Sequence, residues 1–196
     1  RTARRSQEAQ AVARAGAVIG RCFVPEVLAG VLDVPVASLE APLQELVDHA
    51  ILYTFGARDA GYFDFRHQLL RDALYASTSD RDRRRFHARA GEFGGSLEGA
   101  SEVHASLHYE RAGLRAQAYR AALAGARDAA RLSAHREAFG LYQRAVTNMP
   151  DDLPDLERAD VLERLSDEAS AIEENDLAER MARAASDAYR AGGRPD

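Results

Sequence analysis

One histidine stands where its chemistry would suit a negatively charged ligand. The tripeptide Arg66-His67-Gln68 lies at the start of a short segment with helical spacing, residues 67–75. Free backbone N–H groups and the helix dipole favour an anion such as phosphate at the start of a helix. The simpler alternative is that His67 only caps the helix or packs against it.

Arginines form the strongest basic patch of the chain. Five of them accompany one aspartate between Arg81 and Arg89, and helical spacing spreads four over one face: Arg81, Arg84, Arg85 and Arg89. A solvated helix face is the default interpretation of such a run, and docking on an acidic module or a nucleotide is the alternative.

The segment 151–179 is strongly acidic, with twelve carboxylates and only two arginines, Arg158 and Arg164. That balance argues against nucleic acid as the ligand of this segment.

Several catalytic chemistries are excluded by residue type. All 26 basic residues are arginines, so the chain can house neither the lysine of a phosphate-binding loop nor a Schiff-base lysine. It has no G-x-S-x-G motif, and Cys22, the single cysteine, has no base paired with it in the sequence. We therefore expect no catalytic site, and we expect Cys22 to be a buried thiol because Val18, Ile19 and Phe23 surround it.

His104 and His108 have the i, i+4 spacing that can hold a metal ion from one helix face. No further cluster of ligands accompanies them. We expect a structural role for both and no metal site.

The elements that position these residues follow from apolar periodicity and capping signals in the first half. Ser6 is a plausible N-cap, Pro25 suits a first helical turn, and Pro42 is tolerable only near a helix start. The predicted helices are 6–20, 25–32, 38–48, 67–75 and 80–94, and the predicted β-hairpin joins strands 51–55 and 62–65. Three helices, a hairpin and two further helices are the order of a winged-helix domain, which we place at 1–97.

The second half, 98–196, predicts helical hairpins without strands. Expected helices are 102–111, 115–132, 134–148, 155–173 and 176–190, with turns at Gly113, Ser133, Met149-Pro150 and Asn175. Counting back from Pro150 as the end of a 34-residue tetratricopeptide unit places small residues and one tyrosine at the packing positions: Ala126, Ala129, Ala138, Tyr142 and Ala145. A generic helical bundle is the alternative. The fold class is therefore mainly α.

Composition and the two ends of the sequence indicate where the protein is found and whether it is part of a longer polypeptide. The 196 residues have a net charge of −5, and no apolar run reaches the length that crosses a bilayer. We expect a soluble, cytoplasmic protein without a membrane partner. The first residue is not methionine and the end is Gly-Gly-Arg-Pro-Asp, so we interpret the chain as a section of a longer polypeptide.

Five segments, in this order, resemble one family: AGAVIGRCF at 15–23, LQELVD at 43–48, FRHQLLRDALY at 65–75, RRRFH at 83–87 and HYERAG at 108–113. The resemblance covers about residues 11–145. The chain resembles the region that follows the ATPase core in bacterial LuxR-type transcriptional regulators of the signal-transducing ATPase (STAND) class.

The resemblance implies an ATP-binding module before Arg1 and often a DNA-binding helix-turn-helix after the repeats. In related nucleotide switches, a histidine after the wing touches the phosphate of the bound nucleotide and holds the inactive state. His67 and Arg66 are the matching positions, although the family often has Met-His-Asp where this chain has Arg-His-Gln. The implied cofactor is ATP or ADP in the parent protein, with none in this chain.

Three functions follow as hypotheses. The first is a relay that docks on the nucleotide module of the same polypeptide and senses a protein or small-molecule inducer at the helical repeats. The second is a freestanding helical-repeat adaptor for a protein or peptide. The third, direct DNA binding, is disfavoured because the third helix carries Glu40, Glu45 and Asp48 and no arginine.

Overall fold

The computed structural model describes residues 6–55, 61–94 and 102–193 and is mainly α-helical. The chain divides into two compact units, Arg1–Glu98 and Gly99–Asp196. The boundary predicted between 97 and 98 falls in 95–101, outside the described residues. None of the helices in the described ranges is long and apolar enough to cross a lipid bilayer.

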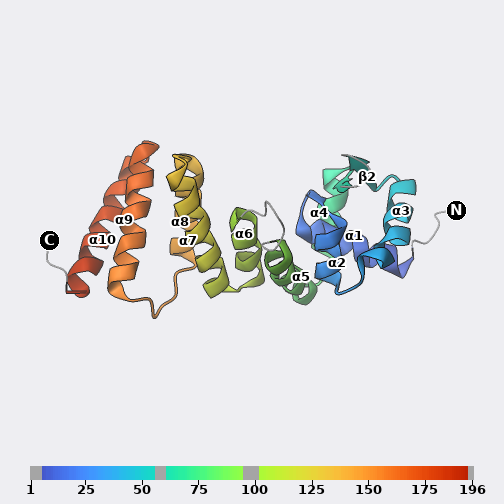
Figure 1. Cartoon of the computed structure of the whole chain (residues 1–196), viewed down its shortest axis with the longest axis horizontal. Coiled ribbons are helices and arrows are strands. Elements are labelled where there is room, and N and C mark those ends of the chain that lie inside the picture. Colours follow the sequence, from blue (N-terminus) through green and yellow to red (C-terminus); the bar gives the residue numbers. More distant parts are fainter. Residues whose placement is uncertain (1–5, 56–60, 95–101, 194–196) are drawn as a thin grey trace. The chain divides into compact units, whose positions relative to one another are not determined.

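The first unit combines helices with a small sheet (Figure 1). Its first helix begins as predicted, because the Ser6 side chain accepts a hydrogen bond from the Ala9 N–H, and Pro25 opens the second helix. In chain order the elements are α1 (Gln7–Ile19), β1 (Cys22–Phe23), α2 (Pro25–Leu32), the 3-10 helix η1 (Val36–Leu39), α3 (Glu40–Asp48), β2 (Leu52–Phe55), β3 (Tyr62–Phe65), α4 (Gln68–Ser77) and α5 (Asp80–Gly94).

The third helix differs from the prediction at its start. Residues Val36–Leu39 form a 3-10 turn, and the α-helix begins at Glu40 rather than at Ser38. Pro42 explains the difference, since it has no N–H to donate to the carbonyl of Ser38 four residues earlier.

The sheet has three antiparallel strands in the order β1-β3-β2. The predicted hairpin of β2 and β3 is confirmed, with Phe55 opposite Tyr62. Strand β1 was not predicted, because two residues are too short to show an alternating pattern. It pairs Cys22 with Asp64, and the expectation of a buried thiol is wrong: Cys22 is exposed.

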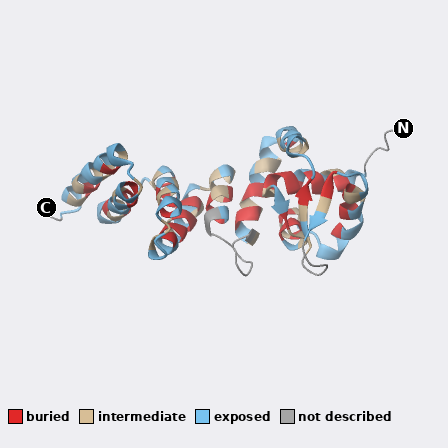
Figure 2. Cartoon of the chain, turned by 90° about the horizontal axis from the view of Figure 1, so that it is seen from above, coloured by how far each residue is buried: buried red, intermediate tan, exposed pale blue. Residues whose placement is uncertain are grey.

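Alternation along β1 and β3 explains the exposure of Cys22. Phe23 and Phe65 point into the core of the first unit, so their neighbours Cys22 and Asp64 lie on the other face of the sheet. Helix α1 lies against α2, α3, α4 and α5, and α2 packs on α5. Figure 2 shows the resulting buried residues as red stripes on these elements.

The second unit consists of paired helices. Each helix packs on its neighbour in sequence, as Figure 1 shows for α7 with α8 and for α9 with α10. The bounds are α6 (Glu102–Ala112), α7 (Arg115–Arg131), α8 (His135–Thr147), α9 (Asp155–Ala171) and α10 (Asn175–Ala191).

A residue in the left-handed backbone conformation follows four of these helices, including Gly193, with a φ of 79°, after α10. Gly113 has a φ of 78°, Ser133 has a φ of 57°, and both lie at predicted turns. The last predicted turn, which we placed at Asn175, lies at Glu173, whose φ is 68°. Asn175 is the first residue of α10. Asparagine adopts this conformation more readily than glutamate, and for that reason the sequence favoured the wrong residue.

Small residues lie where α7 meets α8. All five predicted packing residues are buried in the core of the second unit: Ala126, Ala129, Ala138, Tyr142 and Ala145. Alanine side chains let helix backbones approach closely, and Tyr142 fills space between them.

Candidate functional site

His67 occupies the N-cap position of α4, and its side chain is exposed. Its carbonyl accepts hydrogen bonds from the N–H groups of Leu70, at 3.1 Å, and Arg71, at 3.2 Å. The imidazole makes no capping hydrogen bond to the helix.

The surroundings of His67 favour an anion. The Arg66 side chain is also exposed, and its backbone N–H donates to the carbonyl of Ile51 at 2.9 Å, which fixes the chain just before the helix. The first turn of α4 contains no acidic residue. Two basic side chains therefore lie just before a helix start whose N-cap side chain makes no hydrogen bond to the free N–H groups.

The four predicted docking arginines of α5 have different environments. Arg81, Arg84 and Arg85 are exposed, and Arg85 also lies 3.5 Å from a carboxylate oxygen of Asp82 and over the ring of Phe86. The Arg89 side chain interacts with other residues of the first unit. Its guanidinium donates to the carbonyl of Gly30 at 2.7 Å and to Asp33 at 3.0 Å, and it lies over the ring of Phe93.

Arg89 therefore ties α5 to the end of α2. A guanidinium at the last carbonyls of a helix stabilises that end through hydrogen bonds and the helix dipole. The sequence pattern placed all four arginines on one solvated face, and it contained no signal for the fold that brings Gly30 to Arg89. The freely presented part of the patch is Arg81 and Arg84.

His104 and His108 lie on α6, the first exposed and the second buried. No group of three or more histidine, cysteine, aspartate or glutamate side chains in the described ranges is placed to hold a metal ion.

A polar cluster on the sheet was missed by sequence reasoning. The Oδ2 atom of Asp64 accepts a hydrogen bond from the Tyr53 hydroxyl at 2.9 Å and lies 3.3 Å from Nε of Arg21. The other oxygen, Oδ1, is buried and has no hydrogen-bond partner among the described residues. Strand β1 brings Arg21 to this position, so the cluster could not be predicted without that strand.

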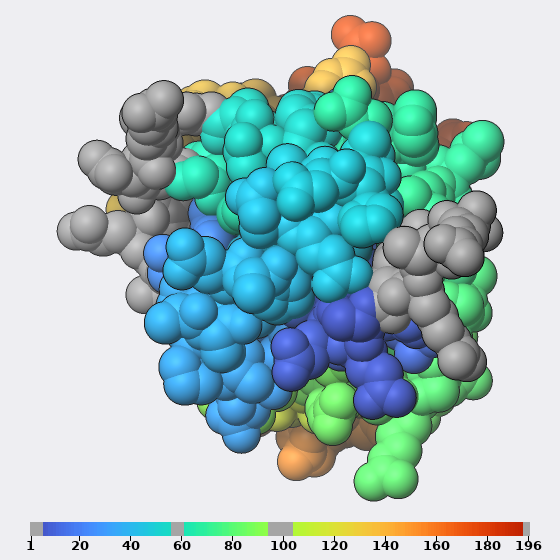
Figure 3. Space-filling model, turned by 90° about the vertical axis from the view of Figure 1, so that its right-hand side faces the viewer, coloured from blue at the N-terminus to red at the C-terminus, as the bar shows by residue number. Residues whose placement is uncertain are grey.

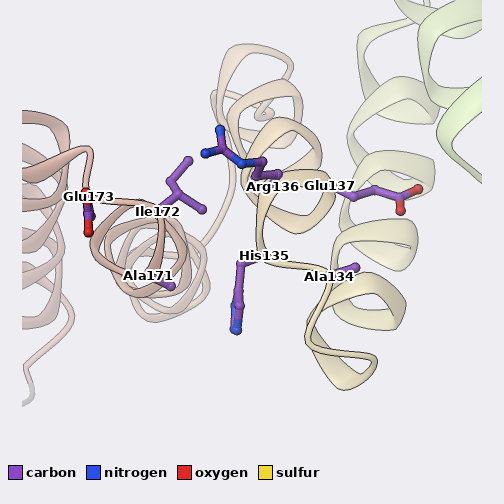
Figure 4. Close-up of a pocket in the computed structure, with 7 residues that line it drawn as sticks. All are labelled: Ala134, His135, Arg136, Glu137, Ala171, Ile172 and Glu173. Carbon is purple, nitrogen blue, oxygen red and sulfur yellow. The ribbon is translucent and has the colours of Figure 1, made fainter.

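The second unit contains a cleft of about 640 Å³ between the start of α8 and the end of α9 (Figure 4). Side chains of both charges line it. In Figure 4, Glu137 points away from α9. The lining residues are Ala134, His135, Arg136, Glu137, Ala171, Ile172 and Glu173.

His135 links the two walls of this cleft. Its Nδ1 atom hydrogen-bonds to Oε2 of Glu168 at 2.9 Å, and Glu168 is buried while the imidazole is half-exposed. The cleft thus offers a cation, a carboxylate and an apolar side chain, which suits recognition of a polar peptide or small molecule better than covalent chemistry.

Comparison with protein-family models, with curated proteins and with solved structures gave no match to this chain. The chemistry of these sites is therefore argued from their own geometry.

Proposed function

We propose that this chain is the regulatory and protein-interaction section of a nucleotide-dependent signalling protein, a LuxR-type transcriptional regulator of the STAND ATPase class. The first unit acts as a winged-helix domain that docks on a nucleotide module, and the second acts as a tetratricopeptide-like repeat. The element order of the first unit and the alanine-packed hairpins of the second support this proposal.

The observation that carries the proposal is the pair of exposed basic side chains at the start of α4. Arg66 and His67 lie just before helix N–H groups that the N-cap side chain does not cap, and no carboxylate lies in the first turn. A phosphate of ATP or ADP held by a neighbouring module would receive hydrogen bonds from both side chains and from the helix start. The cofactor belongs to that module, and this chain contributes contacts to it.

Direct DNA binding is disfavoured by α3, which would enter the major groove. Its charged residues are Glu40, Glu45 and Asp48, and they would repel phosphates. The winged-helix unit then serves as a docking surface within the protein.

The cleft at His135 supports a role for the second unit in sensing. A ligand there would contact α8 and α9 together, and its binding would favour one arrangement of the hairpins only if its affinity differs between two states. The same cleft favours the second candidate, a freestanding adaptor for a protein or peptide. A phosphate-binding loop encoded upstream of Arg1 would support the relay, and its absence would support the adaptor.

Nucleotide release from the full-length parent tests the proposal. His67→Ala and Arg66→Ala should each speed ADP release by about tenfold, the loss of one charge-assisted hydrogen bond, and raise basal output. The control is Arg14→Ala, which removes an exposed arginine from α1. Release rates equal to those of the control would remove His67 and Arg66 from the mechanism.

A further inference from the structure

The first unit carries an apolar groove that the relay does not use. Its volume is about 400 Å³, and it lies between the η1 and α3 segment and the sheet. Apolar side chains make up most of its walls: Pro25, Val36, Ala37, Leu43, Val47 and Phe63. This volume lies within the range of about 300 to 1,000 Å³ in which proteins hold ligand groups.

Exposed valines extend the apolar surface at the groove. Val36, a wall residue, is 45% exposed, and Val34 is 37% exposed on the connection before η1. Figure 3 faces this side of the unit, where the segment running through η1 and α3 (light blue to cyan) lies at the centre. An exposed apolar side chain in the wall of a groove is a feature that interaction sites share.

The charged side chains of the segment that forms one wall of the groove are acidic. From Val36 to Phe55 the sequence contains no arginine and three carboxylates. Two of them are engaged: Glu45 accepts hydrogen bonds from Ser6, and Asp48 accepts one from Gln44. Glu40, in the first turn of α3, lines the groove, is exposed, and has no hydrogen bond or ion pair to other described residues.

We propose that this groove binds an amphipathic helix of a partner protein, with apolar side chains entering between α3 and the sheet and an arginine pairing with Glu40. Apolar anchors supply the affinity, and the carboxylate selects a basic partner and its orientation. The same carboxylates repel nucleic acid and anionic lipid, and the net charge of −5 opposes a second copy of this chain. The proposal goes beyond the relay because it requires no nucleotide.

A synthetic peptide tests the groove. The probe is a fluorescein-labelled helix of about 16 residues, long enough to populate the helical state, with a leucine stripe and arginines on its other face. Fluorescence anisotropy with the whole chain at about 0.15 M salt, where long-range attraction is screened, should give a Kd on the order of 10 to 100 µM. A peptide with glutamate in place of arginine should bind at least tenfold more weakly.

Two variants separate docking from general attraction. Val36→Asp adds negative charge, which would strengthen nonspecific binding of the arginine peptide, but it places a carboxylate in the groove and should weaken binding about tenfold. Glu40→Gln should also weaken binding, whereas Glu92→Gln on α5 removes an equally exposed carboxylate and should leave it unchanged.

Amide chemical shifts of the unmodified chain provide a measurement that needs no variant, and the changes should cluster at η1, α3 and β3. The proposal is overturned if the peptide does not bind, if Val36→Asp binds it as tightly as the parent chain, if Glu40→Gln and Glu92→Gln have equal effects, or if the shift changes lie elsewhere.

Discussion

The imidazole of His135 and the carboxylate of Glu168 are joined by a 2.9 Å hydrogen bond that connects the start of α8 to α9. These residues belong to successive helical hairpins, α7 with α8 and α9 with α10. The bond therefore fixes one hairpin against the next at the edge of the cleft in the second unit.

Removal of this bond should destabilise the chain. His135→Ala leaves the buried Glu168 carboxylate without its partner and should lower the free energy of unfolding by about 1 to 2 kcal/mol. Urea unfolding followed by circular dichroism measures the change. His104→Ala removes an exposed histidine from α6 and should change stability by less than about 0.5 kcal/mol. Equal effects of the two substitutions would show that the bond contributes nothing.

Close packing of α7 on α8 should make its alanines intolerant of larger side chains. Ala126 and Ala145 are fully buried, so Ala126→Leu or Ala145→Leu should cost about 1 to 3 kcal/mol through overpacking. Ala116→Leu on the exposed face of α7 is the matched control, and we expect it to be neutral within about 0.5 kcal/mol. A rise in melting temperature for Ala126→Leu would contradict the packing described for these helices.

Tyrosine ionisation should weaken the second unit at high pH. Burial raises the pKa of the Tyr142 phenol above its usual value of 10.0, and burial followed by the nearby Glu157 carboxylate raises the pKa of Tyr119. The unfolded chain therefore loses these protons before the folded chain does. The stability they contribute is complete below pH 10.0 and is lost as the pH rises toward the folded pKa, by up to about 1.4 kcal/mol per pH unit for each tyrosine.

Tyr142→Phe should remove part of this loss. Urea unfolding at about pH 8 and pH 11 compares the variant with the parent chain, and the difference in stability between the two pH values should be smaller for the variant. The chain contains no lysine, so no side-chain ammonium group titrates in this window. An unchanged pH dependence would mean that the Tyr142 phenol ionises equally well in both states.

Two helical glycines should respond to alanine with opposite signs. A Cβ at Gly16 would lie 2.7 Å from Cε1 of Phe23, a core residue that is 3% exposed and cannot move aside. Gly16→Ala should therefore destabilise the chain by about 1 kcal/mol or more, although alanine favours helix formation. A Cβ at Gly140 in α8 meets no heavy atom within 4 Å, so Gly140→Ala should stabilise by about 0.5 to 1 kcal/mol. Thermal unfolding of both variants checks the signs, and stabilisation by both would contradict the Gly16 contact.

Local signals in the sequence predicted much of the helical framework. Ser6 caps α1, Pro25 opens α2, and Ser133 ends α7, because each acts on groups within a few residues of itself. Strand β1 depends instead on β3, about forty residues further along the chain, and two residues carry no periodicity of their own. The exposure of Cys22 follows from that unpredicted strand.

The site residues also divide into those that nearby residues in the sequence indicate and those that depend on distant segments. His67 was identified because Arg66-His67-Gln68 resembles the family's histidine motif at the start of the helix after the wing, and its side chain is exposed there. Arg89 was assigned to a docking face, but its partners Gly30 and Asp33 lie on a distant segment that only the fold brings near. The cleft at His135 could not be predicted, since its two walls come from different hairpins.

The shortness of the strands has a consequence for handling the protein. Strand β3 pairs with a strand on each side, so the edge strands of the sheet are β1, with two residues, and β2, with four. Each edge strand has few unpaired N–H and C=O groups with which a strand of another molecule could pair. Concentrated samples should therefore resist fibril growth from this sheet.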